Sequence, residues 1–497
     1  MTYQKPETRL LSALVIVMCL LGFFVRLYFY GINRSLWLDE AMLALNIVNR
    51  SFAELLQPLS YDQGAPIGFL LLQKIVIGLL GNWDYVLRLI PLIAGLLSIP
   101  LMYQVSKKYS VGIAPYVASG LFVLSAKLIY YSSELKQYSS DVLVALVILL
   151  TAQKCLEVNA NKRALVVFGV SSVLAIWFSH PILFVIAAVF LALVLSLFER
   201  QNSHQLLHII GTAGVFGISL LLLYVVSLRN LASNDVLLNY WSGSFAPLPP
   251  WSNPGWYYDT LLNVLVDLAG LPGNLISVGV LILGIFSLGS RRWPLMLILV
   301  VPFPLTLIAS ALGKYPFSGR LLLFLIPFLL LLLAEGIERV RSLLLRMNKQ
   351  IALLAMVALV GYLFYNPVMT VHKDLRFPPK QEDIKPVMEY LQQNKTSADL
   401  VYVYYGAEFA FRYYAPFYGL DTIDYVPGIP ARDDPVKYFD DIDRVRENRR
   451  VWFVFSHNCS WCAVNEQRFI VEHLNEVGLK KSESIASDAA VYLYELP

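Results

Sequence analysis

Residues 181–198 of the chain read PILFVIAAVFLALVLSLF, a run of 18 positions without a charged side chain. A helix needs about 20 mostly apolar residues to cross the roughly 30 Å hydrocarbon core of a bilayer. The run therefore predicts a membrane-spanning helix. Any fold proposed for the rest of the chain has to accommodate it.

The composition of the whole chain agrees with this segment. Of the 497 residues, 57% are hydrophobic and 15% are charged, against about 45–50% and about 25% in ordinary globular proteins. A soluble fold lacks the interior to bury so much apolar surface, which excludes a cytoplasmic enzyme, a disordered scaffold and a fibrous repeat. The net charge of +4 gives no reason to expect a nucleic-acid partner, and four cysteines exclude a disulfide-dense secreted scaffold.

Similar apolar runs follow one another up to about residue 366. The first is long and is followed by no small-residue cleavage site, so we interpret it as an uncleaved span and not as a signal peptide. The candidate segments are residues 10–30, 66–81, 86–106, 112–131, 141–157, 164–179, 181–198, 206–228, 273–289, 294–312, 320–336 and 351–366.

The charges between these runs predict the topology. By the positive-inside rule, the pairs Lys107-Lys108, Lys162-Arg163 and Arg291-Arg292 belong in the cytoplasm, together with the N-terminus. The other loops, which begin near residues 31, 132, 180, 229, 313 and 367, then face outward. Only an odd number of crossings can connect an outward loop to Lys107, so we expect residues 66–81 to lie on the outer surface. The alternative is that the loops are assigned to the wrong sides of the membrane, because the predicted outward loops also contain Arg and Lys.

This topology predicts an α-helical, multi-pass protein of the plasma or inner membrane with about 11 transmembrane helices. The membrane domain covers residues 1–366, with a first outward loop at 31–85, which includes surface helices, and a long outward loop at 229–271. After residue 367, strand-like and helix-like runs alternate, which predicts a small extracytoplasmic α/β domain at 367–497. The strand-like runs are Leu400–Tyr405, Val451–Phe455 and Ala490–Glu495, and the helix-like runs include Ile384–Gln393 and Glu466–Val477.

The outward loops concentrate carboxylates beside basic and aromatic residues. The first loop contains Trp37-Leu38-Asp39-Glu40 just after a span. Ionisable groups at the edge of the hydrocarbon are costly and tend to be functional, and a carboxylate there can act as a general base. The alternative is a helix N-terminus, where the macrodipole favours Asp39 and Glu40.

Other polar residues fall on the same predicted face. Aromatic residues there can simply anchor the protein at the interface, and basic residues can extend to lipid headgroups. Their convergence on one face favours a shared anionic ligand, because Arg is suited to bidentate phosphate contacts. The candidates are Asp62, Arg88, Glu134, Lys136, Tyr138, Asp141, His180, Lys314, Tyr315 and Arg320.

This layout resembles the GT-C class of glycosyltransferases that use polyprenyl-phosphate sugars. It is most similar to family 39, which includes protein O-mannosyltransferases and bacterial lipid A aminoarabinose transferases. The resemblance covers about residues 10–365 and depends on the order and spacing of several short motifs. They are Trp37-Leu-Asp39-Glu40, Gly64-Ala-Pro66-Ile-Gly-Phe-Leu-Leu-Leu, Leu87-Arg88-Leu-Ile-Pro91, Ser133-Glu134-Leu-Lys136-Gln-Tyr138 and Tyr315-Pro-Phe-Ser-Gly-Arg320.

The resemblance implies roles for these residues. Asp39 matches the catalytic carboxylate, Glu40 supports it, and Arg88 belongs to the wall of the active site. Glu134 matches the acidic residue of the second outward loop, with Asp141 as the alternative. The lipid phosphate of the donor would be bound by basic and tyrosine side chains, namely Arg88, Lys136, Tyr138, Lys314, Tyr315 and Arg320.

The implied activity is that of a hexosyl- or pentosyltransferase that inverts the anomeric carbon. The donor would be a sugar on a polyprenyl or dolichyl phosphate, and the acceptor a glycan, lipid or protein at the outer face of the bilayer. No cofactor is assigned. Many family members carry His-Pro-Pro before the surface helix, where this chain has Gly64-Ala65-Pro66, so a divalent metal requirement stays open.

Two other functions fit part of the sequence. A transporter or flippase for a lipid-linked sugar would share the many spans, but the two halves of the chain are unrelated and the charges lie at one face. A membrane scaffold with a sensory outer domain would not need carboxylates in both outward loops. In the tail, Cys459-Ser-Trp-Cys462 follows a predicted strand, which leaves a redox motif, a local disulfide and two free thiols as alternatives. The nearby His457 is expected to be structural.

Overall fold

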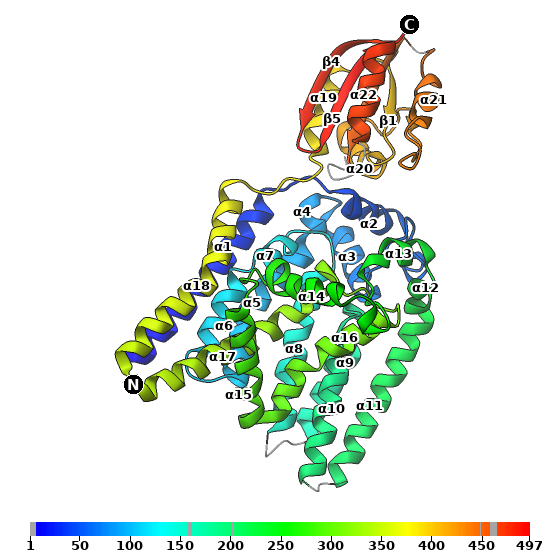
Figure 1. Cartoon of the computed structure of the whole chain (residues 1–497). Helices are drawn as coiled ribbons and strands as arrows, with labels where there is room; N and C mark the ends of the chain where they lie inside the picture. The colour runs from blue at the N-terminus through cyan, green and yellow to red at the C-terminus, as the bar shows by residue number, and fades with distance from the viewer. Residues whose placement is uncertain (1–5, 158–161, 201–202, 448, 458–464) are drawn as a thin grey trace. The chain divides into compact units, whose positions relative to one another are not determined.

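The computed structural model describes residues 6–157, 162–200, 203–447, 449–457 and 465–497. They form two compact units, shown together in Figure 1. The first unit contains the helix that ends at Gly31, Phe52–Gly81 and Tyr85–Phe377. The second contains Ile32–Ser51, Asn82–Asp84 and Pro378–Pro497, so it draws two short pieces from early in the chain.

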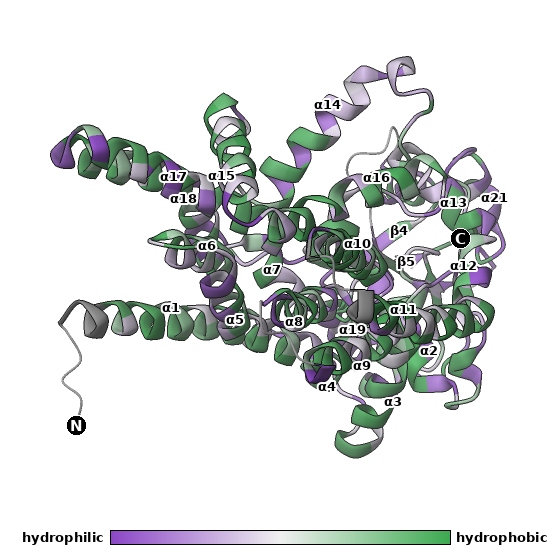
Figure 2. Ribbon diagram, turned by 90° about the horizontal axis from the view of Figure 1, so that it is seen from below, coloured by the Kyte–Doolittle hydropathy of each residue, from purple (hydrophilic) through white to green (hydrophobic). Residues whose placement is uncertain are grey.

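The first unit is built from long apolar helices. Hydrophobic residues dominate α1, α10 and α11 (Figure 2). The long elements are α1 (Pro6–Gly31), α5 (Leu89–Tyr109), α8 (Tyr138–Leu156), α9 (Lys162–Phe178), α10 (Ile182–Arg200), α11 (Ser203–Leu223), α15 (Leu275–Val300), α16 (Pro302–Ala311), α17 (Ile326–Met347) and α18 (Lys349–Arg376). Within the described residues, 8 stretches are long and apolar enough to cross a membrane. The chain is therefore a multi-pass membrane protein, while the predicted number of 11 spans stays a prediction.

Several predicted spans differ in detail from the helices. The run 112–131 is divided into α6 (Ala114–Val123) and α7 (Ala126–Tyr131). Between the runs 273–289 and 294–312, α15 is interrupted at Arg292, whose φ of −150° and ψ of 68° are not helical. The nearby Pro294 accounts for the kink, because proline removes a donor and disfavours helix in the residue before it. Helix α18 continues past residue 366, through Pro367, to Arg376.

Helix α3 (Ile67–Leu80) occupies the run predicted to lie on the surface. It has 14 residues, which corresponds to about 21 Å of helix and is less than the hydrocarbon thickness. It starts directly after Pro66 and ends at Gly81, whose φ of +88° stops the helix. The side chain of Gln73, buried in the middle of α3, donates a hydrogen bond to Leu87 O at 2.9 Å.

Short helices and turns connect the long ones. They are α2 (Leu38–Asn49), α4 (Asp84–Leu87), α12 (Arg229–Ala232), α13 (Asp235–Tyr240) and α14 (Pro254–Asn263), the 3-10 turns η1 (Glu54–Leu56), η3 (Ser242–Ser244), η4 (Pro250–Ser252) and η6 (Gly319–Leu325), and the π-helical turns η2 (Tyr224–Leu228) and η5 (Val264–Leu268).

The core of the first unit depends on the close approach of α15 and α17. A Cβ atom added to Gly284 would lie 1.9 Å from Leu332 O, and one added to Gly336 would lie 1.9 Å from Val280 O. Small residues let transmembrane helix backbones approach each other in this way. Around this contact, α17 buries every residue from Ile326 to Glu338.

The second unit contains a five-stranded mixed sheet in the order β2-β1-β3-β5-β4. Strand β1 pairs in parallel with β2 and β3, whereas β5 is antiparallel to β3 and β4. The strands are β1 (Leu400–Val403), β2 (Tyr425–Pro427), β3 (Arg450–Ser456), β4 (Leu479–Ala486) and β5 (Ala489–Glu495). The connecting helices are α19 (Ile384–Asn394), α20 (Glu408–Tyr414), α21 (Lys437–Asp443) and α22 (Glu466–Val477), with the turn η7 (Ala415–Tyr418).

Each face of this sheet is covered by helices. On one face, the ring of Trp452 in β3 contacts Tyr390 of α19. On the other face, Tyr402 in β1 donates a 2.6 Å hydrogen bond to Asp441 of α21, and Tyr404 donates one of 2.7 Å to Glu466 of α22. The small α/β fold expected from the sequence is therefore present, with two strands, β2 and β4, that the sequence pattern did not predict.

Candidate functional site

The carboxylates Asp39 and Glu40 lie in the first turn of α2, inside the second unit. Asp39 is half-buried and Glu40 is fully buried. Acidic residues stabilise the start of a helix because the backbone N–H groups there are unsatisfied and carry partial positive charge. The alternative noted from the sequence is thus present as local structure, and it is compatible with a chemical role for Asp39.

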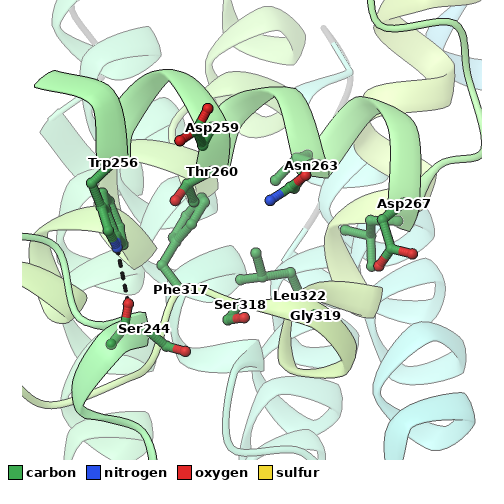
Figure 3. A pocket seen from close by; sticks show the side chains of 13 residues that line it. Ser244, Trp256, Asp259, Thr260, Asn263, Asp267, Phe317, Ser318, Gly319 and Leu322 are labelled. Atoms are coloured by element: carbon green, nitrogen blue, oxygen red, sulfur yellow. Dashed lines mark hydrogen bonds between the residues drawn. The ribbon is translucent and has the colours of Figure 1, made fainter. Parts of the chain in front are cut away.

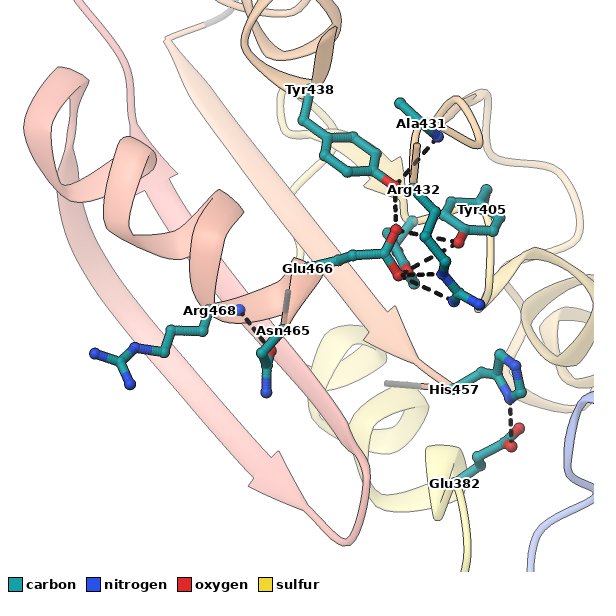
Figure 4. A network of polar contacts seen from close by, with 10 residues as sticks. Glu382, Tyr405, Ala431, Arg432, Tyr438, His457, Asn465, Glu466 and Arg468 are labelled. Carbon is teal, nitrogen blue, oxygen red and sulfur yellow. Dashed lines mark hydrogen bonds and ion pairs between the residues drawn. The ribbon is translucent and has the colours of Figure 1, made fainter. Parts of the chain in front are cut away.

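A carboxylate from the tail completes the start of α2. Leu38 N donates a hydrogen bond to Glu382 Oε2 at 2.7 Å, and the second oxygen of Glu382 lies 2.7 Å from His457 Nδ1 (Figure 4). Glu382 and His457 both have positive φ, 50° and 59°. Such backbone conformations are unfavourable for non-glycine residues and persist when the surrounding contacts enforce them. The structure thus holds Glu382 between the helix that carries Asp39 and the end of β3.

More contacts attach the same segment to the tail. Ser35 Oγ donates to Asp383 Oδ1 at 2.7 Å, and Leu36 N donates to the hydroxyl of Tyr414 at 2.8 Å. Lys385 donates to the carbonyl of Asn33 at 2.8 Å and forms an ion pair with Asp84, which also accepts from Tyr414. The residues around Asp39 are therefore positioned by side chains that follow them by more than 300 positions in the sequence.

The first unit holds a second group of predicted residues. The guanidinium of Arg320 lies 5.7 Å from the ring centroid of Tyr138 and 6.0 Å from that of Trp241. Tyr131 lies in the electrostatic range of Glu134, Arg320 and Tyr138. Cation–π contacts with aromatic rings orient the plane of a guanidinium. The structure thus brings together three of the predicted residues and adds Tyr131 and Trp241, which the sequence interpretation did not single out.

Three further predicted residues of the first unit are buried and ionisable. Glu134 is 0% exposed and Arg88 is 2% exposed. Lys136, 5% exposed, donates a hydrogen bond to Gln63 Oε1 at 2.9 Å. Burying charged groups is costly, and membrane proteins retain them mainly where they are used. Gln63 is a further residue that the sequence did not identify, although it lies beside the predicted Asp62.

Asp141 is buried, and Tyr315 and His180 are partly buried. Burial, together with nearby Asp141 and Tyr138, raises the pKa of Tyr315 well above its usual range, and its hydroxyl donates to Leu321 O at 2.8 Å. Burial lowers the pKa of His180 to about 4, so the imidazole is neutral at pH 7. His180 therefore cannot supply positive charge to a phosphate. Tyr315 keeps its hydroxyl proton, which it donates to the carbonyl of Leu321.

Two other predicted residues lie at the surface of the first unit. Asp62 is exposed and accepts a 2.9 Å hydrogen bond from Asn234, and Lys314 is exposed at the start of the loop before η6. In the described part of the chain, no group of three or more His, Cys, Asp and Glu side chains could hold a metal ion. Cys459 and Cys462 lie outside the described residues. Glu466, the first residue of α22, accepts hydrogen bonds from Arg432, Tyr404, Tyr405 and Tyr438 (Figure 4). These contacts join the end of β1 to α21 and α22, so the network is structural.

A cavity of about 270 Å³ opens between residues 243–268 and the segment before α17 (Figure 3). Its lining includes Trp256, Asp259, Thr260 and Asn263 from α14 and Asp267 from η5. Phe317, Ser318 and Gly319 line it from the other side, next to Arg320 in the chain. The sequence indicated only that residues 229–271 face outward and are rich in aromatic residues.

Comparison with known proteins gives a match in structure alone. No family model matches the chain, and no curated protein matches its sequence. ArnT from Cupriavidus metallidurans bound to undecaprenyl phosphate aligns over 97% of both chains, with 14% identity and a TM-score of 0.56. Its apo state aligns over 98% of both chains, with 12% identity and a TM-score of 0.57. The Archaeoglobus fulgidus oligosaccharyltransferase AglB, in complex with an inhibitory peptide and a dolichol-phosphate, covers 97% of this chain and 74% of its own, with 13% identity and a TM-score of 0.50.

The chain has the GT-C fold. The alignment with ArnT extends over nearly the full length of both proteins, so it includes the membrane helices and the α/β unit together. The resemblance noted from the motifs of the sequence is confirmed at the level of fold. The GT-C fold itself does not assign a role to any side chain.

Proposed function

We propose that the protein is an integral membrane glycosyltransferase. It would transfer a sugar from a polyprenyl phosphate or dolichyl phosphate to an acceptor on the extracytoplasmic face, with inversion at the anomeric carbon. The observation that carries this proposal is the full-length likeness to ArnT bound to undecaprenyl phosphate, combined with buried charged groups at the predicted outward loops. In this proposal the N-terminus is cytoplasmic, and residues 1–366 and 367–497 act as catalytic membrane domain and extracytoplasmic domain.

Asp39 is the proposed general base. Its carboxylate takes the proton from an acceptor hydroxyl or amine while that atom forms a bond to the anomeric carbon. Its half-buried place in the first turn of α2 supports this role, because it is accessible and yet held by the contacts of Leu38 and Ser35. A base of this kind typically contributes about 10²–10⁴-fold to the rate. Glu40, fully buried beside it, is proposed to support the start of the helix.

The leaving group is the lipid phosphate. The bond between the anomeric carbon and the phosphate oxygen breaks, and the phosphate departs with the electron pair. Arg320 is proposed to stabilise the charge that develops, since its planar guanidinium is held between Tyr138 and Trp241. Lys136 and Arg88 are proposed to add positive charge from the surrounding wall, with Lys314 and Tyr315 at its edge. Glu134, with Asp141 as the alternative, is the second proposed acidic group.

The test of this function compares envelope glycans by mass spectrometry in four strains of the source organism. A strain without the gene is expected to lack one sugar on an otherwise intact glycan, and wild-type protein is expected to restore it. The variant D39N is expected to reach the membrane in normal amount and to restore less than about 1% of the sugar. The matched control D235N changes an exposed aspartate at the start of α13 and is expected to restore it fully.

Two outcomes would overturn the proposal. Loss of the entire glycan from the outer face would indicate a flippase for the lipid-linked sugar. Full restoration by D39N would remove Asp39 as the base. A purified protein in proteoliposomes, supplied with the organism's own lipid extract, then shows whether transfer occurs on one face of the bilayer.

A further inference from the structure

The cavity beside α14 has the properties of a site for one ring-sized ligand. Its volume is about 270 Å³, just below the range of about 300–1,000 Å³ found for small-molecule pockets. Trp256, Thr260, Asn263 and Asp267 recur at helical spacing, which places them on one face of the continuous helix formed by α14 and η5. Figure 3 shows Trp256, Thr260 and Asn263 facing Phe317 and Ser318.

The aromatic walls of this cavity are held in place before any ligand binds. The indole N–H of Trp256 donates to Gly243 O at 3.0 Å, which fixes the plane of its ring. Phe317 is 2% exposed, and its backbone N–H donates to Ser244 O at 2.9 Å, so the two walls are joined. The helix widens to a π-turn at Val264–Leu268, and Val264, Asp267 and Leu268 of this turn line one end of the cavity. Turns of this kind are often found at functional sites.

The charges of the lining limit the kinds of ligand. Asp259 and Asp267 are carboxylates, and none of the lining residues is Lys or Arg. Asp267 forms an ion pair with Lys127 at 2.9 Å, whereas Asp259 makes no hydrogen bond or ion pair within the described part of the chain. An anionic group such as a phosphate or a carboxylate would be repelled here. The two carboxylates are eight residues apart, about 12 Å along a helix, which is too far for both to bind one metal ion.

A sugar ring fits this combination. Its C–H face packs on an aromatic side chain, and its hydroxyls need acceptors and donors at the edge of the ring. Carboxylate, amide and hydroxyl groups supply both functions. We propose that this cavity binds one sugar ring of a substrate, neutral or bearing an amine, and excludes rings that carry a carboxylate. Trp256 packs against the ring, and Asn263 and Thr260 bind its hydroxyls, while the exposed carboxylate of Asp259 lies at the rim of the cavity.

The position of the cavity links this site to the proposed reaction, on which the inference rests. Gly319 lines the cavity, and Arg320, the next residue, is the proposed phosphate ligand. Trp241, whose ring lies 6.0 Å from the guanidinium of Arg320, is likewise only two residues before the lining residue Gly243. Two chain segments therefore connect the cavity to the proposed phosphate ligand. The ring in the cavity belongs to the donor or to the acceptor, and the experiment distinguishes the two.

The experiment measures binding separately from transfer. Purified full-length protein in nanodiscs is titrated with methyl glycosides of neutral sugars, amino sugars and uronic acids, and binding is followed by saturation-transfer NMR. We expect at least one neutral or amino glycoside to bind and every uronate to bind at least tenfold more weakly. W256A, or N263A if W256A fails to fold, should weaken the binding at least tenfold. The control W251A changes a tryptophan that is 80% exposed and does not line the cavity, and it should have no effect.

A charge variant tests the selectivity directly. D259N is expected to reduce the discrimination against uronates at least threefold while leaving the fold intact. Absence of binding by every glycoside, or equal binding by wild type, W256A and N263A, would overturn the site. Binding that is lost in W251A as well would also overturn it, because the effect would then lie outside the cavity.

Two further arms identify the source of the ring and separate this inference from the proposed function. In the first arm, transfer is measured from a lipid extract to a glycan extract. If W256A raises the lipid concentration needed for half-maximal transfer, the cavity binds the donor sugar. If W256A instead raises the glycan concentration needed for half-maximal transfer, the cavity binds the acceptor sugar. D39N should keep the glycoside binding of wild type. If glycosides bind but no transfer is seen, the cavity is a sugar site and the proposed glycosyltransferase function is wrong. If Asp39-dependent transfer is seen but no glycoside binds, the proposed function holds and the sugar site is wrong.

Discussion

Glu382 is the residue whose role in the site was least predictable from the sequence. It lies in a polar stretch that resembles a linker, and only the structure shows that it accepts from Leu38 N and approaches His457. A carboxylate at a helix start satisfies an open N–H group and interacts favourably with the helix dipole. Glu382 is therefore a positioning residue for α2, and it acts on Asp39 through the backbone of its neighbour.

We expect graded effects from two changes at Glu382. E382Q keeps an acceptor but loses the charge, and E382A loses both, which corresponds to about 1.5–3 kcal/mol for a hydrogen bond to a charged group. Hydrogen exchange in α2 should become faster in the order wild type, E382Q, E382A, and kcat should fall in the same order with little change in the KM for donor. The control E389Q alters an exposed glutamate on α19. Unchanged exchange in E382A would contradict this role.

Arg320 gives a second prediction at the scale of a residue. Its guanidinium lies between Tyr138 and Trp241, a geometry that favours a planar cation over the point charge of lysine. We expect R320K to bind undecaprenyl phosphate about tenfold more weakly than wild type, and R320Q about a hundredfold more weakly, as measured by ligand-dependent thermal stabilisation in detergent. Equal affinities of R320K and R320Q would show that the charge of Arg320 does not contact the phosphate.

Acid stability is a prediction for the elements of the sheet. Burial alone would raise the pKa of Asp399, but hydrogen bonds from Arg450, Thr396 and Trp452 outweigh it and lower the pKa. The same balance, with Tyr438, Tyr404 and Arg432 as donors, lowers the pKa of Glu466. A lowered folded-state pKa stabilises the fold above the unfolded value, about 4 for these groups, and this contribution is lost as the pH falls through the folded value.

The α/β unit should therefore lose stability below about pH 4. D399N is expected to destabilise it by about 1–3 kcal/mol at pH 7, and the difference from wild type should narrow as the pH falls below 4. Urea unfolding of the full chain in detergent, detected by the susceptibility of the tail to proteolysis, measures the free energy of unfolding at each pH for wild type and D399N. The control D433N removes an exposed carboxylate and should behave as wild type. A difference that is constant with pH would mean that ionisation of Asp399 is irrelevant to stability.

The contact between α15 and α17 gives a prediction for a pair of helices. A methyl group at position 336 would overlap the backbone of Val280, so G336A must move one helix. We expect a loss of about 1–3 kcal/mol, the usual cost of overpacking, seen as a lower melting temperature in detergent. G361A, on α18, meets open space and should be neutral or slightly stabilising. Equal melting temperatures for the two variants would show that α15 and α17 can separate at low cost.

For the whole molecule, the sequence predicted individual helices and strands better than it predicted which of them pack into the same unit. Long apolar runs such as 181–198 gave the membrane helices, and buried hydrophobic runs gave β1, β3 and β5. Strand β4 was missed because its LKKSESIA sequence lies at the exposed edge of the sheet and carries no hydrophobic pattern. Strand β2 was missed because it has three residues.

The residues of the candidate site were also only partly recognisable from the sequence. Asp39, Glu134 and Arg320 could be proposed as charges in loops that are predicted to face outward. Trp241 and Glu382 were not, because their importance depends on partners that are distant in the sequence. No local pattern reports that Ser35 will meet Asp383 or that Leu38 will meet Glu382. The division of 1–366 and 367–497 describes composition, whereas the compact second unit also includes Ile32–Ser51.

The second unit combines residues from near the start of the chain with residues from its end, which has a consequence for synthesis of the protein. Leu38 and the carboxylate that caps it are 344 residues apart, so at about 5–20 residues per second the ribosome needs roughly 17–70 s to supply the partner. During that time the helix that carries Asp39 lacks its cap. A chain that ends before Glu382 has all the residues of its membrane helices but lacks this acceptor for the first turn of α2. If Asp39 is the base proposed above, we expect such truncated chains to be inactive, so that only complete copies transfer sugar.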